Sequence, residues 1–327
     1  MGNARETWRK KCGLFSLLSV VVCGLFSYAG SEAERHLPQT DPDNPSIHQD
    51  PETTRRTWRG SQNIEPGLRG RSILFFEDFE DPLYQEKWPV HWGSAPGHGT
   101  VSDPPSNVFS GRRSAYTESK KGRHESAGSG EYVPEAAIDE EAYVRLYLRL
   151  QDGFSMGDSR ELKLFGIRGG ARLEDSYGGA GKRPTGRDKF NVMLVIDNWR
   201  EMRLYYYHPD QEGGYGDYAG CYRPFCRPVL SPGKWYCLEL LLKTNTPGEK
   251  DGQLKAWLDG RLVIKVEGLR FRDTDRVKIR RFTIANYFGG GLKSDTSPKD
   301  QRIYIDNFVV SKERIGCVGD GLEGQIR

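Results

Sequence analysis

The sequence is poor in the residues that metal centres use, and it lacks a sustained helical pattern. Its 327 residues include six histidines and six cysteines, and no two cysteines form a CxxC pair. Structural zinc sites usually carry paired cysteines at short spacing, so we expect no metal and no cofactor. Apolar residues do not recur at helical spacing over any long segment, and no internal repeat is present. These absences favour an all-β protein.

Net charge is also lacking once the N-terminus is set aside. The chain has 48 basic and 45 acidic residues. Residues 1–30 contain four of the basic residues and one of the acidic ones, which leaves 44 of each in the remainder. A neutral body has no global field that recruits nucleic acid or a membrane surface, so we expect neither as a partner. Any attraction for an acidic polymer must arise locally, in a cleft.

Residues 1–30 have the pattern of a secretory signal peptide. A basic run at residues 9–11 precedes an apolar run at residues 13–26, and small residues follow it. The apolar run is short for a membrane span of about 20 residues, so we expect no stable span after cleavage; an uncleaved anchor is the alternative. The N-terminus therefore predicts a secreted or periplasmic protein.

Four cysteines remain beyond the signal peptide, namely Cys221, Cys226, Cys237 and Cys317. In an exported chain they indicate two disulfides, for which three connectivities exist. The short separation between Cys221 and Cys226 favours that pair, which leaves Cys237 for Cys317.

The rest of the chain divides into a polar linker and a region of strand patterns. Residues 31–71 are polar and contain prolines, so we expect a disordered linker there. Residues 72–311 alternate apolar and polar residues between turn signals, which predicts a two-sheet antiparallel β-sandwich of jelly-roll type, expected to be a monomer, and residues 312–327 form a tail. The expected strands begin at residue 73 and include 143–150, 161–166, 190–196, 202–207, 235–242, 254–258, 262–266, 282–287 and 302–310.

A lysine and three consecutive tyrosines lie on two of these strands. Lys163 lies on one, and Tyr205, Tyr206 and Tyr207 lie on another. Side chains alternate across a strand, so Tyr205 and Tyr207 share one face and Tyr206 takes the other. Two phenols and a lysine can transfer protons without a metal. The glycine-rich run at residues 166–170 is expected to form a loop beside a cleft.

The run around the lysine resembles a known motif. Residues 163–166 read Lys-Leu-Phe-Gly and are followed by Gly169 and Gly170, which is similar to the KLPG…GG motif of polysaccharide lyase family 14, a family that includes alginate lyases. The resemblance covers residues 73–311 and implies a concanavalin-like jelly roll that cleaves an acidic, uronate-containing polysaccharide such as alginate. Further similar runs are 233–236, 245–248, 268–272, 287–290 and 304–308.

The resemblance also implies which residues form the site. The family's lysine falls on Lys163 and its two tyrosines on Tyr205 and Tyr207, while a serine position falls on Asn191 and an arginine position on Met193. Asn191 can still hydrogen-bond a carboxyl group, whereas Met193 cannot supply the charge of a guanidinium. Lys163 and Asn191 would bind the substrate carboxylate, and the two tyrosines would act as base and acid of a β-elimination.

A neighbouring strand offers candidates for the missing positive charge. In residues 143–150 the apolar residues are expected to face the core, so Arg145, Tyr147 and Arg149 face outward. If this strand lies beside the Lys163 strand, Arg145 or Arg149 reaches the same pocket and Tyr147 contacts the glycan. His208 is a further substrate-binding candidate and an alternative base.

Two other interpretations compete with the lyase. A non-catalytic glycan-binding module would use Tyr147, Tyr205, Tyr207 and Trp199 only as stacking platforms. Glycoside hydrolysis would use two carboxylates, for which Glu161 and Asp197 are available. Independently of the reaction, a calcium ion could bridge Glu77 or Glu80 to Asp306, since first and last strands often pair in such sandwiches.

Overall fold

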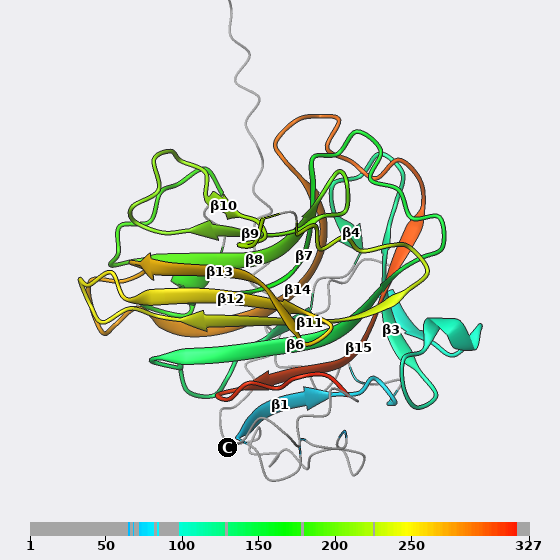
Figure 1. The fold of residues 1–327 in the computed structure, drawn as a ribbon, viewed down its shortest axis with the longest axis horizontal. Coiled ribbons are helices and arrows are strands. Elements are labelled where there is room, and N and C mark those ends of the chain that lie inside the picture. Colours follow the sequence, from blue (N-terminus) through cyan, green and yellow to red (C-terminus); the bar gives the residue numbers. More distant parts are fainter. Residues whose placement is uncertain are drawn as a thin grey trace, which may run out of the picture. The chain divides into compact units, whose positions relative to one another are not determined.

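Two antiparallel β-sheets make up the described part of the protein (Figure 1). The computed structural model describes residues 65, 68, 72–81, 84, 98–127, 130–177, 180–224 and 226–318, all within the unit of residues 58–327. The prediction of an all-β, two-sheet antiparallel sandwich is confirmed. The predicted signal peptide, residues 1–30, lies outside the described residues.

The larger sheet has nine strands. They are β1 (Ile73–Glu77), β2 (His98–Val101), β3 (Ser114–Ser119), β4 (Ser126–Ala127), β6 (Glu141–Leu150), β11 (Trp235–Lys243), β12 (Gly252–Leu258), β13 (Arg261–Leu269) and β15 (Gln301–Ser311). They pair in the order β13-β12-β11-β6-β15-β3-β2, with β1 also paired to β15 and β4 to β3.

The smaller sheet has six strands. They are β5 (Gly130–Tyr132), β7 (Glu161–Gly170), β8 (Lys189–Asp197), β9 (Met202–Tyr207), β10 (Asp217–Ala219) and β14 (Lys278–Gly289), in the order β10-β9-β8-β7-β14-β5. Two short 3-10 helices, η1 (Pro105–Asn107) and η2 (Glu174–Ser176), lie in connections. The prediction of a loop at residues 166–170 is wrong, because β7 continues to Gly170 and pairs there with both β8 and β14.

One face of each sheet contributes to a shared apolar core. In β6, Val144, Leu146 and Leu148 are at most 1% exposed, as the alternation predicts. Leu162 and Ile167 of β7 are fully buried in the same cluster. Burying one such side chain stabilises the fold by about 1.5–3 kcal/mol, so this core accounts for the packing of the two sheets.

The opposite face of β6 is covered as well. Arg145 is fully buried, and its Nη2 lies 2.5 Å from Glu65 Oε2. The Tyr147 ring stacks on Phe109 with centroids 3.6 Å apart, and Arg149 donates a 3.0 Å hydrogen bond from Nη1 to the Asn107 side chain. A buried guanidinium that lost its carboxylate would be strongly destabilising. Glu65 lies within the segment predicted to be a linker, so part of that segment is packed against the sheet.

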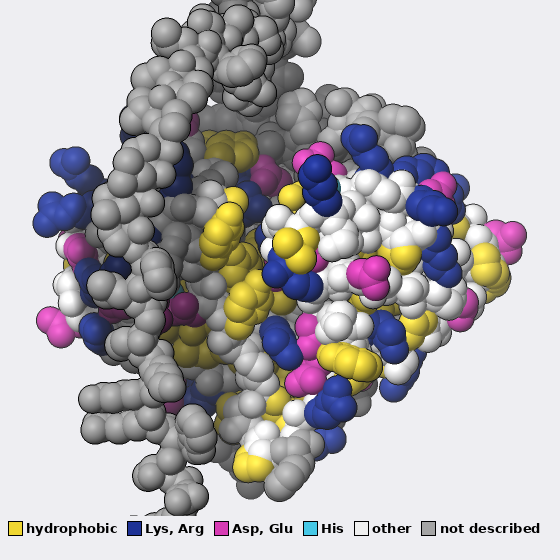
Figure 2. Space-filling model, turned by 90° about the horizontal axis from the view of Figure 1, so that it is seen from above, with side chains coloured by type: hydrophobic (Ala, Val, Ile, Leu, Met, Phe, Trp, Pro, Cys, Tyr) yellow, Lys and Arg dark blue, Asp and Glu magenta, His cyan; other side chains and the backbone are white. Residues whose placement is uncertain are grey.

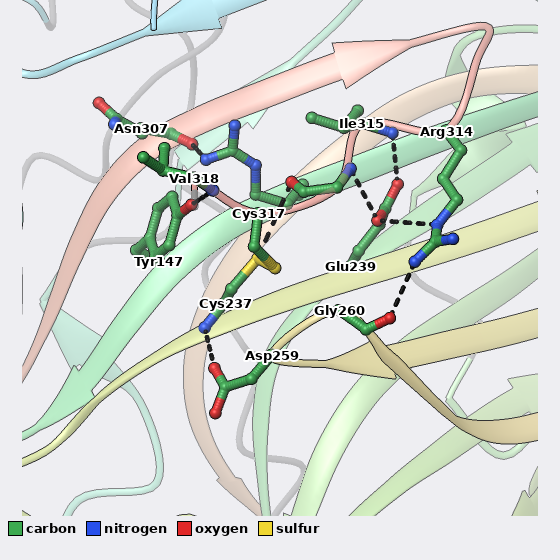
Figure 3. The surroundings of a disulfide bond; sticks show 12 residues. Tyr147, Cys237, Glu239, Asp259, Gly260, Asn307, Arg314, Ile315, Cys317 and Val318 are labelled. Carbon is green, nitrogen blue, oxygen red and sulfur yellow. Dashed lines mark hydrogen bonds and ion pairs between the residues drawn. A yellow bond between two sulfur atoms is a disulfide. The ribbon is translucent and has the colours of Figure 1, made fainter. Parts of the chain in front are cut away.

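The chain after β15 is anchored to the larger sheet beside this ion pair (Figure 3). Cys317 is disulfide-bonded to Cys237 of β11. Glu239, also on β11 and fully buried, accepts hydrogen bonds from the amides of Ile315 at 2.7 Å and Gly316 at 3.1 Å. The part of the predicted tail up to residue 318 is therefore attached to the outer face of the larger sheet.

Both predicted disulfides are present. Cys221 and Cys226 are separated by 5 positions, and Cys237 and Cys317 by 80. Nowhere in the described part of the chain is there a helix long and apolar enough to cross a membrane.

The longer disulfide should contribute more to stability than the shorter one. Replacing Cys237 and Cys317 together by alanine should lower the free energy of unfolding by about 2–4 kcal/mol, because the bond closes a long loop in the unfolded chain. Denaturant titration of the purified variants measures this. The matched control is Cys221→Ala with Cys226→Ala, which should lose less; an equal loss in both would contradict the loop-closure explanation.

Candidate active site

The face of the smaller sheet that points away from the core carries the predicted lysine and tyrosines. Across β8 and β9, Asn191 lies opposite Tyr207 and Met193 opposite Tyr205. Directly opposite residues of antiparallel strands share a face. Lys163 of β7 reaches the same face, since its Nζ lies 5.2 Å from the centre of the Tyr205 ring. We call the surface that carries these five residues the tyrosine face.

Tyr205 and Tyr207 form a hydrogen-bonded pair. The Tyr205 hydroxyl donates to the Tyr207 hydroxyl across 2.7 Å. The amide of Gly216 donates to the Tyr205 oxygen at 3.3 Å, and the amide of Gly181 donates to the Tyr207 oxygen at 3.4 Å. Burial, followed by the hydrogen bond to Tyr207, raises the pKa of Tyr205 well above its ordinary value. Tyr205 therefore keeps its proton, and the Tyr207 oxygen accepts two hydrogen bonds.

Lys163 is held between aromatic rings and a carboxylate. Its Nζ lies 5.1 Å from the centre of the Tyr287 ring and 3.4 Å from Glu161 Oε1. The other oxygen of Glu161 accepts a 2.6 Å hydrogen bond from Tyr218, whose ring stacks on Tyr205 with centroids 4.7 Å apart. The Lys163 side chain is 23% exposed, so the ammonium is fixed in place yet accessible.

Asn191 presents a buried acceptor to the same surface. Its Oδ1 has no hydrogen-bond partner among the described residues. Buried amide oxygens normally have a partner, so the unpaired atom indicates a donor that a ligand supplies. A sugar hydroxyl or a protonated carboxyl group fits that requirement.

Met193 gives the surface an apolar floor. Its side chain is 1% exposed and packs with Val195, Tyr205, Tyr207 and Ala285. No cationic group therefore occupies the position that the family resemblance assigns to an arginine.

The prediction that Arg145 or Arg149 joins this pocket is wrong. Both lie on β6, which pairs with β11 and β15 in the larger sheet, whereas β7 pairs with β8 and β14. Tyr147 of the same strand is packed against Phe109 and is 3% exposed, so it offers no surface to a glycan. Alternation correctly placed these side chains away from the core, but it does not specify which strands are neighbours.

His208 is also away from the tyrosine face. Its Nε2 lies 2.7 Å from Asp217 Oδ2, and its ring lies 5.2 Å from the Tyr206 ring. Asp217 lies opposite Tyr206, which packs in the main core. The histidine is therefore grouped with the core-facing side of β9, and the prediction that it binds substrate with Tyr205 and Tyr207 is not supported by its position.

Two arginines that the sequence analysis did not select lie on the tyrosine face. Arg168 of β7 is opposite Asn191 on one side and Arg281 of β14 on the other. Arg168 could have been noticed because it lies within the lysine motif. The glycine-rich run around it predicted a loop, however, and a loop has no alternation from which the direction of a side chain can be read. Glu161 and Tyr218 were likewise identified as partners of Lys163 and Tyr205 only by the structure.

The carboxylates considered for calcium already accept protein donors. Asp306 Oδ2 accepts the Ser114 hydroxyl at 2.7 Å and the amides of Phe109 and Ser110 at 3.2 and 3.1 Å, and burial raises the pKa of Asp306 to about 7. Glu80 Oε1 accepts the backbone amides of Arg112 at 2.7 Å and Arg113 at 3.0 Å. Within the described ranges, no group of three or more His, Cys, Asp or Glu side chains could hold a metal ion.

Exposed tyrosines are a feature of the described surface. Tyr177, Tyr215, Tyr218 and Tyr287 are each at least 36% exposed. On the face seen in Figure 2, side chains of the hydrophobic class, in which tyrosine is included, lie among basic and acidic ones. Aromatic rings with polar tips next to charged groups suit contact with a polar polymer.

A β-sandwich that carries a lysine and two hydrogen-bonded tyrosines on one sheet face defines the class of jelly-roll polysaccharide lyases. The family model described as Polysaccharide lyase 14 matches residues 114–308, which is more than half of the chain. The chain belongs to polysaccharide lyase family 14.

Solved structures share the fold at low identity. The marine PL-14 alginate lyase from Aplysia kurodai is 20% identical with a TM-score of 0.60, over 73% of this chain and 99% of that one. The alginate lyase vAL-1 from Chlorella virus is 18% identical with a TM-score of 0.58, over 74% and 100%. A variant of the alginate lyase Aly36B, solved with an alginate trisaccharide, is 24% identical with a TM-score of 0.52, over 62% and 82%. No curated protein sequence matches the chain.

Gly166 should be required beneath the site. A Cβ atom there would lie 2.1 Å from the Val192 carbonyl oxygen and 2.5 Å from the Met193 sulfur, so Gly166→Ala forces β7 away from β8. The free energy of unfolding should fall by about 1–3 kcal/mol, as overpacking usually costs, measured by thermal or denaturant unfolding. Gly220→Ala is the matched control, since a Cβ at Gly220 meets nothing within 4 Å. An unchanged Gly166→Ala protein would contradict the close approach.

Proposed function

We propose that the protein is an exported lyase that cleaves a uronate-containing polysaccharide by β-elimination on the tyrosine face. The observation that carries this proposal is the 2.7 Å hydrogen bond between Tyr205 and Tyr207 with Lys163 beside it. Membership of polysaccharide lyase family 14 supports the reaction class. The names of similar structures, alginate lyases and an endo-β-1,4-glucuronan lyase from Trichoderma reesei, support an acidic substrate.

The reaction needs three events at one sugar residue. A base removes the proton from the carbon next to the carboxyl group, and the electron pair forms a carbon–carbon double bond. The bond from the adjacent carbon to the glycosidic oxygen breaks, and an acid protonates that oxygen. No water is consumed, and the product carries an unsaturated uronate at its new non-reducing end.

The pair of tyrosines supports a division of roles. Tyr207 is the base, because its oxygen is the acceptor of the hydrogen bonds from the Tyr205 hydroxyl and the Gly181 amide and can receive the proton of the substrate. Tyr205 is the acid, because its raised pKa keeps its proton available for the leaving oxygen. In this assignment Tyr205 gives its proton to the leaving oxygen, and Tyr207 takes a proton from the sugar. That proton then passes from Tyr207 to Tyr205 along their hydrogen bond, which restores both groups.

Lys163 and Asn191 support the substrate on either side of the apolar floor. The ammonium of Lys163 stabilises the negative charge that develops on the carboxyl group as the proton leaves. Asn191, with its unpaired buried Oδ1, accepts from a hydroxyl or a protonated carboxyl of the bound sugar.

A methionine at position 193 is compatible with a polysaccharide-binding surface. Two variants of the alginate lyase Aly36B were solved with alginate oligosaccharides, one with a lysine and a methionine replaced and one with a lysine and a tyrosine replaced. That methionine precedes that tyrosine by the same number of positions as Met193 precedes Tyr207. The spacing supports Met193 as part of the binding surface.

Export is supported by the two disulfides. Disulfides persist in oxidising compartments and are rare in the reducing cytosol. A secreted or periplasmic lyase would also meet its polymeric substrate directly.

The base role of Tyr207 can be tested by removing its hydroxyl. Tyr207→Phe should lose about 100- to 10,000-fold in kcat on oligouronates, as loss of one acid–base group usually costs, while binding stays close to that of the parent. The assay follows the ultraviolet absorbance of the unsaturated product over a panel of uronate polymers.

Tyr206→Phe is the matched control, because it makes the same chemical change on the same strand but on the core-facing side. It should keep its turnover. A Tyr207→Phe protein as active as the parent would refute the assigned role. Glycan binding by the parent without unsaturated product from any uronate would instead favour a non-catalytic binding module.

A further inference from the structure

Four buried polar atoms without a hydrogen-bond partner lie close together on the tyrosine face. They are Arg168 Nε, Asn191 Oδ1, Arg281 Nη2 and Thr283 Oγ1. Arg168 is opposite both Asn191 and Arg281 across the ladders, and Thr283 follows two positions after Arg281 on β14. Thr283 and Arg281 are at most 2% exposed. Buried donors and acceptors normally have partners, so this cluster indicates a site that a ligand completes.

The same cluster carries an excess of positive charge. Arg281 and Arg168 share one carboxylate, that of Glu131 on β5, which forms an ion pair with Arg281 Nη1 and lies 3.8 Å from Arg168 Nη1. Two guanidinium groups against one carboxylate leave a net charge of +1 among these three residues. The Arg281 guanidinium is also covered by Tyr177, 3.4 Å from its ring centre. Solvent screens this positive charge less than it would on an open surface, because Arg281 is fully buried.

Arg168 is the member of the cluster that a ligand can reach. Its side chain is 22% exposed, whereas that of Arg281 is fully buried. Its ion pair with Glu131 is long, so most of its donors are available for another anion. A guanidinium presents a planar fork of donors that matches a carboxylate in two hydrogen bonds.

A β-bulge brings Arg168 to this face. The pairing of β7 with β8 shifts between Lys163 and Phe165, so that Phe165 and Ile167 join Leu162 in the core. Strict alternation from Lys163 would have put Arg168 on the core side. A bulge that re-aims one charged side chain beside a candidate site is a functional feature rather than a defect.

The cluster is set apart from the tyrosines. Tyr205 and Tyr207 lie on β9, and Arg281 and Thr283 lie on β14, with β8 and β7 between them. Arg168, the residue that a ligand can reach, lies on β7, which is two strand spacings or about 10 Å from β9. One carboxylate cannot contact groups at both ends of that span.

From these observations we propose that Arg168, supported by Arg281 and flanked by Thr283, forms an anion subsite for the carboxylate of a sugar residue next to the one that reacts. The proposal rests on the proposed function for the nature of its ligand. It predicts a substrate that lies across the strands from β9 towards β14, with acidic groups on neighbouring residues. It also explains how the face attracts a polyanion although Met193 carries no charge and the body of the chain is neutral.

The subsite can be tested by measuring binding without turnover. In the Tyr207→Phe background, calorimetry should show that Arg168→Gln weakens binding of an oligouronate tetrasaccharide by about 10- to 100-fold, as loss of a charged hydrogen bond implies. Arg168→Lys keeps the positive charge but lacks the planar pair of donors. Its affinity should lie between that of the Tyr207→Phe background and that of Arg168→Gln. Arg302→Gln is the matched control, because it removes one positive charge from β15 of the larger sheet and should change affinity less than twofold.

The ligand's acidic group is tested with a carboxyl-reduced tetrasaccharide of the same length. This reduced tetrasaccharide should bind the Tyr207→Phe protein more weakly than the acidic one does. Adding Arg168→Gln should not weaken its binding further. The subsite would be overturned if Arg168→Gln bound the tetrasaccharide as tightly as its Tyr207→Phe background does. It would also be overturned if Arg302→Gln lost as much affinity as Arg168→Gln. If the parent forms no unsaturated product but Arg168→Gln still weakens oligouronate binding selectively, the lyase proposal fails and the subsite stands. If the parent forms unsaturated product at a normal rate but Arg168→Gln does not change oligouronate binding, the subsite fails and the lyase proposal stands.

Discussion

The register between β7, β8 and β9 is the constraint on which the tyrosine face depends. Residues that are opposite across these ladders point to the same side, so Asn191 with Tyr207 and Met193 with Tyr205 are fixed as neighbours by backbone hydrogen bonds. A slip of one residue in β9 would exchange Tyr206 with its two neighbours and send both hydroxyl groups into the core. The positions of the candidate site residues relative to one another are therefore set by the pairing of these strands.

The outer faces of the two sheets differ in the described part of the chain. The outer face of β6 and β11 is occupied by an ion pair between Arg145 and Glu65 and by the segment that Cys317 ties to Cys237. Buried charges that are paired in this way stabilise one arrangement, since breaking the pair leaves an unpaired charge. The larger sheet thus has a covered outer face, whereas the smaller sheet presents the residues of the proposed active site.

Much of the fold and part of the site could be predicted from the sequence. Period-two patterning located β6, β8, β9 and β15 and assigned the core face of β6, and cysteine spacing, taken with the predicted signal peptide, led to both disulfides. The same patterning placed Tyr205 and Tyr207 on one face. It failed for the arginines at 145 and 149, because alternation describes each strand alone and says nothing of which strands pair.

What the sequence determined by itself is local: which residues form strands, which side of each strand is apolar, and that a lysine and two tyrosines lie on separate strands. The tertiary structure decided which strands became neighbours, and it placed β6 in the sheet away from the site. It also decided the phase of β7, where a bulge after Lys163 turned Arg168 towards Asn191 instead of the core. The physical reason is that strand order and bulges depend on hydrogen bonds between segments far apart in the chain, and these leave no periodic trace in the sequence of either segment.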